Sequence, residues 1–468
     1  MSGEININKN LIDMEYAVRG PLALKALEMK RQGRVIIPCN VGNPQALGQE
    51  PITFYRQVLS FLENPVRINL ERKLKMIHPE DNYAFSKDIV LDYSAKFLEL
   101  METGMGAYTE SKGPYFIRKA VAEFIDNRDG NDIPASDPDN IFLTDGASEG
   151  AKSLIEILIS GPRDGIMTPI PQYPLYSATI KRYGGVQINY YPDEDNDWRL
   201  NRSILEDSYQ NAVKKNIDVK AIVIINPSNP TGAVLDKKSI IEVVEFADEY
   251  GMSIIADEVY QDNVYDGKFI SLAKMIGKRD IPLFCLHSTS KGFYGECGHR
   301  GGYFEVRNPP KIKGRNDQFV DILYKQASVN LCSNTVGQAL VYMMVNPPAD
   351  NNKTGQDFII EKNNILSNLV QKANRIRKAF IEMEGVECFG NTGAMYLFPR
   401  INKMPDGKTD FNYCMDLLEK TGICTVNGTG FGQKGGTHHL RVAFLPKIEL
   451  LEEVLPKWIN FHNRFVNS

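Results

Sequence analysis

Lys291 ends a short polar segment, Ser288-Thr289-Ser290-Lys291, that directly follows an apolar stretch of the chain. A lysine held in a partly dry site has a lowered pKa, and its neutral amine can form a Schiff base with a carbonyl compound. Arg300 follows nine residues later, and a guanidinium can bind a phosphate through two parallel hydrogen bonds. Because an isolated lysine is nearly always a solvated surface residue, this interpretation depends on the residues that accompany it.

A second anion-binding pattern lies at Gly146-Ala147-Ser148. Small residues let the backbone approach an anion closely, and the helix that we expect to begin here offers unpaired N–H groups and the positive end of its dipole. The Ser148 hydroxyl adds a further donor. The alternative is an ordinary helix start, because serine is a favoured capping residue.

Asp257 and Tyr260 lie in the segment Asp257-Glu258-Val259-Tyr260, directly after an apolar stretch. A carboxylate at the end of a buried strand can keep the nitrogen of a heteroaromatic ring protonated, since a nearby opposite charge favours the charged form. The alternative is a capping aspartate followed by a tyrosine that packs in the core.

Asn229 and Arg441 also stand out by their surroundings. Asn229 belongs to residues 226–232, a rigid turn with two Asn-Pro pairs, and turn chemistry explains most of that segment. Arg441 interrupts an apolar stretch that we expect to be a strand, where a guanidinium is costly unless it is paired. Either a buried acid or an anionic substrate must therefore satisfy Arg441, and the sequence leaves both open.

The chemistry-bearing residues follow short apolar segments that we expect to be strands. These segments alternate with helical patterns, which is typical of a parallel sheet covered by helices on both faces. Ligands of such sheets bind outside the carboxyl ends of the strands, where Ser148, Asp257 and Lys291 fall. The predicted strands are residues 141–144, 166–168, 221–225, 253–256 and 283–287.

The C-terminal part has a different pattern. Residues 363–383 have helical period, residues 393–398 and 439–444 read as strands, and a final helix begins near Ile448. We expect an α/β protein in three parts. Residues 1–79 form an N-terminal arm and part of a small α+β domain, residues 80–330 form a large domain, and residues 331–468 complete the small domain.

The composition argues against several classes of function. The net charge is -4 and the pI is about 6.0, without the basic patch of a nucleic-acid binding protein. No apolar run reaches the roughly 20 residues of a membrane helix. Seven scattered cysteines form no C-x-x-C pair, so we expect no metal site and reduced thiols. The polar start lacks a secretory or Arg-rich targeting pattern, and we therefore expect a cytoplasmic protein.

In their order and approximate spacing, the motifs around Asn229, Asp257, Lys291 and Arg441 resemble those of the fold-type I, class I aminotransferases, which depend on pyridoxal 5′-phosphate. The resemblance implies a large domain with a mostly parallel, seven-stranded sheet and a smaller α+β domain built from both chain ends. It is strongest to the branch of the family that acts on alanine. The stretches that carry it are residues 51–59, 169–178, 256–265, 287–303, 393–398 and 421–432.

The resemblance also implies roles for the residues around the cofactor's ring. Lys291 would form the Schiff base and move protons, and Asp257 would pair with the ring nitrogen. Tyr260 and Asn229 would bind the ring's phenolic oxygen. Tyr173 would stack on the ring, although Tyr176 lies close by in the sequence.

The remaining roles concern the two anionic groups. Arg441 would bind the substrate's α-carboxylate, and the backbone at Gly42 and the side chain of Asn229 would lie nearby. Tyr108 would reach the phosphate bound by the other subunit of a homodimer. The phosphate site within one chain would comprise Ala147, Ser148, Ser288, Ser290 and Arg300.

The implied activity is transfer of the amino group of L-alanine to 2-oxoglutarate, which gives pyruvate and L-glutamate by ping-pong kinetics. The residue that receives the distal carboxylate is not identified: Arg19 is one candidate, and a surface role for it is another. Four alternatives stay open: an aminotransferase for another amino acid, a lyase or synthase on the same fold, a cofactor-binding regulator, and a structural protein with a degenerate site.

Overall fold

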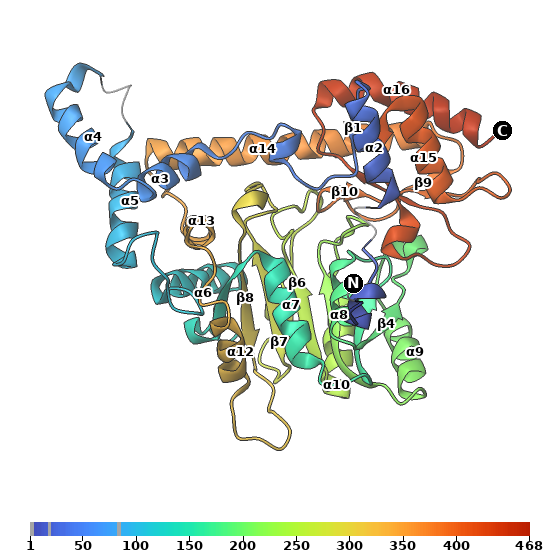
Figure 1. Ribbon diagram of the computed structural model, residues 1–468, viewed down its shortest axis with the longest axis horizontal. Helices are drawn as coiled ribbons and strands as arrows, with labels where there is room; N and C mark the ends of the chain where they lie inside the picture. The colour runs from blue at the N-terminus through green and yellow to red at the C-terminus, as the bar shows by residue number, and fades with distance from the viewer. Residues whose placement is uncertain (1–3, 17–19, 82–85) are drawn as a thin grey trace. The chain divides into compact units, whose positions relative to one another are not determined.

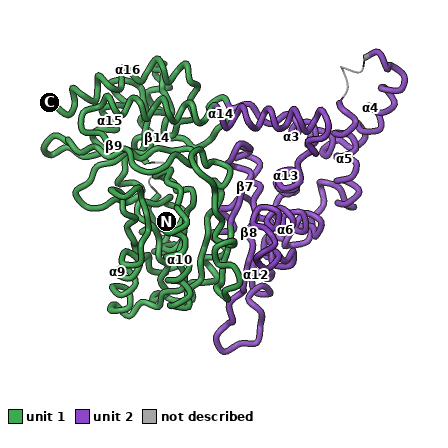
Figure 2. The backbone as a smooth tube through the Cα atoms, turned by 180° about the vertical axis from the view of Figure 1, so that it is seen from behind, with its two compact units in different colours: residues 1–48, 151–285, 368–468 green, residues 49–150, 286–367 purple. Residues whose placement is uncertain are grey.

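The computed structural model describes residues 4–16, 20–81 and 86–468. The chain divides into two compact units, each assembled from separate stretches of sequence (Figure 2). Unit 1 comprises residues 1–48, 151–285 and 368–468, and unit 2 comprises residues 49–150 and 286–367. These boundaries differ from those of the three-part division expected from the sequence. That three-part division stays a prediction.

The central sheet has seven strands in the order β2-β8-β7-β6-β5-β3-β4. β3 pairs in parallel with β4 and β5, and β5 pairs in parallel with β6, whereas β2 and β8 are antiparallel. The predicted, mostly parallel sheet is confirmed, and all five predicted strands are present. The bounds are β2 (Ile141–Asp145), β3 (Asp164–Pro169), β4 (Val186–Tyr190), β5 (Asp218–Ile225), β6 (Ser253–Asp257), β7 (Leu283–Ser288) and β8 (Gly301–Arg307).

The middle strands of unit 1 are buried where their sequences are apolar. In β5 every residue from Ala221 to Ile225 is buried, which requires cover on both faces of the sheet. Helix α9 (Arg202–Val213) packs against β4 and β5, and α8 (Leu175–Arg182) packs against β3 and β4.

Helix α10 (Lys237–Tyr250) shows how local sequence sets the element ends in this layer. The Asp236 side chain accepts a hydrogen bond from the backbone N–H of Ser239 at the start, as a capping residue should. Gly251 ends the helix with a φ of 61°, a left-handed conformation that favours glycine. The two capping residues thus flank the stretch that carries the buried apolar face of the helix.

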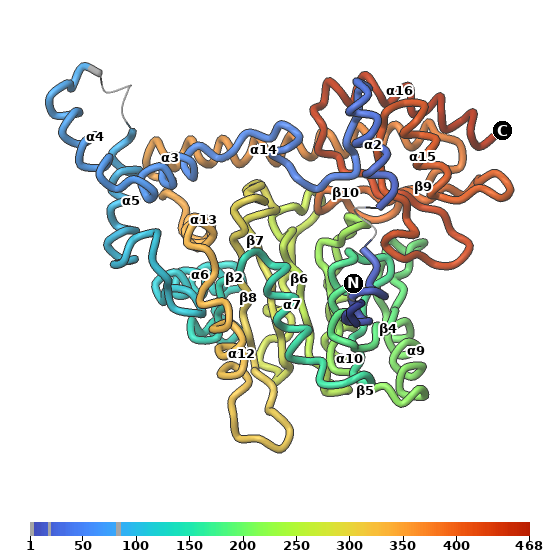
Figure 3. The backbone as a smooth tube through the Cα atoms, viewed as in Figure 1, coloured from blue at the N-terminus to red at the C-terminus, as the bar shows by residue number. Residues whose placement is uncertain are grey.

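Both chain ends contribute to unit 1, as the sequence predicted. β1 (Ile37–Pro38) pairs in parallel with β12 (Ile423–Cys424), and α2 (Pro21–Arg31) packs against α15 (Asp410–Thr421). Figures 1 and 3 show this N-terminal segment in blue among red C-terminal elements. The other elements of this part are β9 (Val386–Glu387), β10 (Tyr396–Leu397), β11 (Arg400–Ile401), β13 (Val426–Asn427), β14 (Leu440–Ala443) and α16 (Ile448–Phe465).

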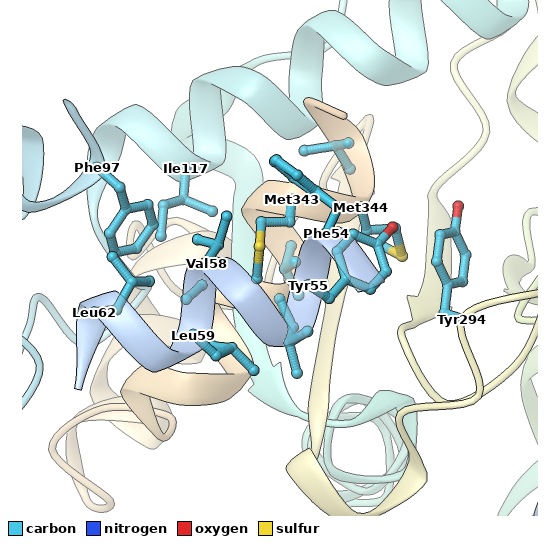
Figure 4. Close-up of a cluster of buried hydrophobic side chains, with 14 of the residues drawn as sticks. Phe54, Tyr55, Val58, Leu59, Leu62, Phe97, Ile117, Tyr294, Met343 and Met344 are labelled. Carbon is cyan, nitrogen blue, oxygen red and sulfur yellow. The ribbon is translucent and has the colours of Figure 1, made fainter. Parts of the chain in front are cut away.

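Unit 2 has its own apolar core. One face of α3 (Thr53–Leu62) carries Phe54, Tyr55, Val58, Leu59 and Leu62 at helical spacing, and all five are buried. Figure 4 shows these side chains beside Phe97, Ile117 and Met343. Fully burying one such side chain contributes roughly 1.5–3 kcal/mol, so this face anchors α3. These partners come from α5 (Asp88–Met101), α6 (Tyr115–Asp129) and α13 (Thr335–Val345).

The remaining helices complete the two units. None of the described helices has the length and apolar character that crossing a membrane requires. Their bounds are α1 (Lys9–Ile12), α4 (Val66–Ile77), α7 (Ala147–Leu158), α11 (Leu272–Ile276), α12 (Phe319–Ser328) and α14 (Lys353–Ile381).

Candidate active site

Lys291 follows strand β7 and is half-buried. The turn that carries it is fixed by Ser288, whose hydroxyl donates to the carbonyl of Gly301 at 3.1 Å and accepts from the N–H of Ser290 at 3.1 Å. The chain then continues through Gly292, whose φ of 66° favours glycine. In this arrangement the Ser288 hydroxyl donates its hydrogen bond to the backbone. Its expected role toward a phosphate stays a prediction.

Arg300 contacts other residues of unit 2 that were predicted to bind the phosphate. Its Nη2 donates to the Ser148 hydroxyl at 3.1 Å and to the Asp145 carbonyl at 3.1 Å, and its Nη1 lies 3.5 Å from the Ser290 hydroxyl. α7 begins beside it at Ala147. The guanidinium, the hydroxyls and the helix start together form a concentration of donors that suits a dianion.

Gly146 lets the Arg300 side chain come this close. A Cβ at Gly146 would lie 2.3 Å from Arg300 Nη2, and the residue has a φ of 79°. A side chain there would displace the guanidinium and strain the backbone. The sequence motif Gly146-Ala147-Ser148 is thus more than a helix cap, because its first residue makes room for the cation.

Tyr108 of unit 2 is predicted to act on another subunit. Its side chain is 76% exposed, which is high for a tyrosine in a folded chain. The exposure leaves the ring available to a partner, and the role itself stays a prediction.

Asp257 is the last residue of β6, and its carboxylate is buried. The hydroxyl of Tyr176 donates to Asp257 Oδ2 at 2.7 Å. Burial and the neighbouring charge of Asp257 raise the pKa of the Tyr176 phenol well above its usual value. Tyr176 therefore stays protonated and acts as the donor to the carboxylate.

Tyr173 and Tyr176 could not be distinguished by sequence, and the structure gives them different surroundings. Tyr176 is fully buried on Asp257, whereas Tyr173 is half-buried and accepts a hydrogen bond from the Tyr16 hydroxyl at 2.8 Å. The rings of Tyr16 and Tyr173 meet edge to face, 6.3 Å apart. Tyr173 is thus the less buried of the two, and its stacking role stays a prediction.

Arg441 is buried within β14, with its guanidinium 4.3 Å from the ring centre of Tyr396 and 4.7 Å from that of Phe431. It donates to Asn229 Oδ1 at 3.1 Å and to the carbonyl of Asn40 at 2.8 Å. Its Nε has no partner, and no carboxylate among residues 4–16, 20–81 and 86–468 forms an ion pair with it. Of the two partners that the sequence left open for Arg441, a buried acid is therefore not found among the described residues.

Tyr260, Tyr396 and Gly42 meet beside this cation. The Tyr260 hydroxyl donates to the Tyr396 hydroxyl at 3.3 Å. Burial, and then the neighbouring Tyr396, raise the pKa of Tyr260 well above its usual value. A Cβ at Gly42 would lie 1.9 Å from the Tyr396 hydroxyl oxygen, so only a glycine lets this backbone approach. The predicted residues Gly42, Asn229, Tyr260 and Arg441 are thus neighbours within unit 1.

Sequence reasoning missed several residues of this cluster. Tyr396 lies in the stretch 393–398, which the resemblance included but without a role for the tyrosine. Phe431 lies in the stretch 421–432, which the resemblance also included without a role for the phenylalanine. Asn40 gave no signal, because its contact with Arg441 joins positions far apart in the chain. Arg19, the candidate for the distal carboxylate, lies outside the described residues.

Comparison with known proteins shows extensive similarity. The family model described as aminotransferase class I and II matches residues 82–456. Two relatives are each 41% identical: a Dictyostelium discoideum protein named probable alanine aminotransferase, mitochondrial (99% of this chain, 89% of that protein), and glutamate–glyoxylate aminotransferase 2 of Arabidopsis thaliana (99% and 96%). A solved alanine aminotransferase from Pyrococcus furiosus is 27% identical with a TM-score of 0.78, and the match covers 98% of this chain and 100% of that one.

The predicted cytoplasmic location is wrong in view of these relatives. The relatives from Dictyostelium discoideum, Saccharomyces cerevisiae and Arabidopsis thaliana are alanine aminotransferases named mitochondrial. The prediction rested partly on the expectation of reduced thiols. Reduced thiols are compatible with more than one reducing compartment, so that expectation could not single out the cytoplasm.

Proposed function

Because the chain belongs to the aminotransferase class I and II family, we propose that it transfers the amino group of L-alanine to 2-oxoglutarate with pyridoxal 5′-phosphate as cofactor. The products are pyruvate and L-glutamate. Members of this family act on amino acids and 2-oxo acids. The choice of alanine is supported by full-length relatives and a solved structure that carry the name alanine aminotransferase.

The observation that carries the proposal is the buried, unpaired cation of Arg441. A buried charge without a counter-ion is strongly unfavourable, and this guanidinium has three N–H groups left after its bonds to Asn229 and Asn40. The α-carboxylate of an amino acid or 2-oxo acid supplies the missing charge and accepts two of these donors. Arg441 therefore serves as the carboxylate clamp of both substrates.

The described residues also fit the cofactor. The cradle at Gly146, with Arg300 and Ser148, suits a phosphate dianion. Asp257 offers a buried carboxylate to the ring nitrogen, and Tyr173 offers an accessible aromatic face. Ala147, Ser288 and Ser290 complete the proposed phosphate site, while Asn229 and Tyr260 serve the ring's phenolic oxygen.

Pyridoxal phosphate, when bound, supplies an aldehyde for amino groups and a ring that accepts the electrons of a broken Cα–H bond. Lys291 would hold the cofactor through its Nζ. With an amino acid bound, the same Nζ would be the base that removes the Cα proton and retains it. Arg441 fixes the carboxylate during this transfer, and Asp257 holds a proton on the ring nitrogen through its negative charge. The amino acid and the 2-oxo acid use the same residues in turn, so the kinetics are ping-pong.

A homodimer is part of the proposal. Tyr108 is largely exposed within its own chain, and we assign its hydroxyl to the phosphate bound by the partner subunit. Sedimentation of the purified protein should give twice the mass of the chain. A Tyr108→Phe variant should then bind the cofactor several-fold more weakly. A monomer with full activity would contradict this assignment.

The activity is tested in two half-reactions. The protein is purified with pyridoxal phosphate, and L-alanine is added without any 2-oxo acid. The yellow band of the bound cofactor should bleach while one pyruvate appears per active site, and added 2-oxoglutarate should restore the band and yield glutamate. Bleaching by L-aspartate or an aromatic amino acid, but not by alanine, would disprove the substrate while leaving the chemistry intact. Absence of any protein-bound cofactor would disprove the proposal as a whole.

A second candidate acceptor is glyoxylate, because a relative of equal identity is named glutamate–glyoxylate aminotransferase 2. Its single carboxylate would use Arg441 as the others do. The two candidates differ in whether the site must also accept a distal carboxylate on the acceptor. The ratio of kcat/KM for 2-oxoglutarate to that for glyoxylate, measured with L-alanine and then with L-glutamate as donor, decides between them.

A further inference from the structure

Tyr176 has no place in the reaction described so far, yet it makes a short contact with Asp257, a residue of the proposed machinery. Its side chain is fully buried, and its hydroxyl donates to Asp257 Oδ2 at 2.7 Å. Tyr176 lies in α8, whereas Asp257 ends β6. The contact therefore ties the end of the strand to the helix that follows Tyr173.

We propose that Tyr176 is a positioning residue that fixes the orientation of the Asp257 carboxylate toward the cofactor's ring nitrogen. The inference rests on the proposed function, because the ring nitrogen is the group that Asp257 serves there. The Tyr176 hydroxyl lies 2.7 Å from Oδ2, and the backbone N–H of Val259 lies 3.5 Å from Oδ1. Oδ1 is the oxygen assigned here to the ring nitrogen.

Asp257 needs such a contact because the carboxylate of an aspartate rotates easily about its terminal torsion. The terminal torsion of aspartate is broad and roughly two-fold, so a carboxylate without a fixed partner samples many orientations. A hydrogen bond to a charged acceptor is stronger than one between neutral groups, and it also replaces part of the water that a buried carboxylate has lost. The bond from Tyr176 thus keeps the carboxylate both charged and aligned without delivering a second positive charge.

Tyr190 provides a matched control within the same unit. Its side chain is 1% exposed and that of Tyr176 is 0% exposed, and its hydroxyl also donates at 2.7 Å. The acceptor, however, is the neutral carbonyl of Val223. Removing either hydroxyl deletes one buried hydrogen bond of the same length, so the two variants differ in whether the lost acceptor is Asp257.

The test compares Tyr176→Phe with Tyr190→Phe by three readouts: the Kd of the apoprotein for pyridoxal phosphate, the separate kcat and KM for L-alanine, and the pH titration of the bound cofactor's visible absorption. Tyr176→Phe should raise the Kd and lower kcat by about tenfold or more, which corresponds to the loss of one hydrogen bond to a charged group. It should shift the titration midpoint and leave KM within about twofold. Tyr190→Phe should leave all three readouts within about twofold.

A second comparison uses Asp257→Ala as background, where Tyr176 has lost its acceptor. Adding Tyr176→Phe there should change neither Kd nor kcat, since the bond is already absent. The melting temperature of this double variant should equal or exceed that of Asp257→Ala, which keeps the inference testable if Tyr176→Phe alone folds poorly.

Three results would overturn the inference: equal effects of the two single variants, multiplicative effects in the Asp257→Ala background, or a Tyr176→Phe protein with unchanged Kd, kcat and titration. If the unsubstituted protein binds the cofactor and transaminates alanine, such a result removes only the role of Tyr176. If the unsubstituted protein binds no pyridoxal phosphate, the proposed function fails and the inference fails with it.

Discussion

Replacing Arg441 by lysine keeps the positive charge but removes the planar fork of the guanidinium. Arg441 uses two of its five N–H groups for Asn229 and Asn40, which leaves three for a ligand. A lysine has three N–H groups on one atom and cannot serve both asparagines and both oxygens of a carboxylate. At least one hydrogen bond to a charged group is lost, about 1.5–3 kcal/mol. We therefore expect kcat/KM for L-alanine to fall about 10- to 150-fold.

The assay is the rate at which L-alanine bleaches the bound cofactor in a single half-reaction, measured over a range of alanine concentrations. Propionate, which is alanine without its amino group, should lose affinity by a similar factor as a competitive inhibitor. The control is Arg400→Lys, since Arg400 has Glu194, Asp195 and Glu387 as partners within 3.2 Å and should leave kcat/KM within about twofold. Equal losses in the two variants, or an unchanged inhibition constant for propionate, would refute the role of Arg441.

Three further predictions concern other residues of the site. Lys291→Ala should abolish multiple turnover, because no other amine holds the cofactor and moves the proton, and sustained pyruvate production by that variant would refute the assignment. Asp257→Ala should weaken cofactor binding and slow proton removal more than it lowers the melting temperature, and wild-type rates would mean that another group protonates the ring. Gly42→Ala places a Cβ 1.9 Å from the Tyr396 hydroxyl, an overpacking that costs about 1–3 kcal/mol. It should reduce kcat/KM about ten- to hundredfold, Tyr396→Phe should restore part of that loss, and no rescue would show that the clash lies elsewhere.

The sequence predicted the buried strands of the sheet well because their apolar runs report burial directly. It missed β8, whose sequence contains Glu305 and Arg307. Both side chains are buried and their charged atoms lie 2.9 Å apart. The sequence of a strand that buries an ion pair looks too polar for a buried strand, because composition alone does not show that the two charged side chains pair with each other. β4, with its half-buried pattern at the end of the sheet, was missed because its apolar signal is diluted.

The sequence named in advance several residues that the structure brings together, and it did so where a residue's chemistry was tied to its motif. The clusters around Arg300 and Arg441 bring together residues that the sequence had named, and these include Ser148 and Asn229. The sequence could not decide whether an acid or a substrate pairs with Arg441, because that question depends on contacts between distant positions. The contacts of Tyr176 with Asp257 and of Tyr396 with Tyr260 were missed for the same reason, since the partners lie 81 and 136 residues apart along the chain.

The pairing of β1 with β12 has a consequence for the biosynthesis of this protein. Ile37 and Ile423 are register partners, so the loop between them contains most of the chain. A ribosome releases the N-terminus first, at about 5–20 residues per second. The segment around Gly42 must therefore wait many seconds for its partner strand, and the proposed carboxylate clamp cannot assemble on a nascent chain. Shortening the C-terminus before Ile423 would leave that early segment with an unpaired edge, a target for chaperones and proteases rather than a folded intermediate.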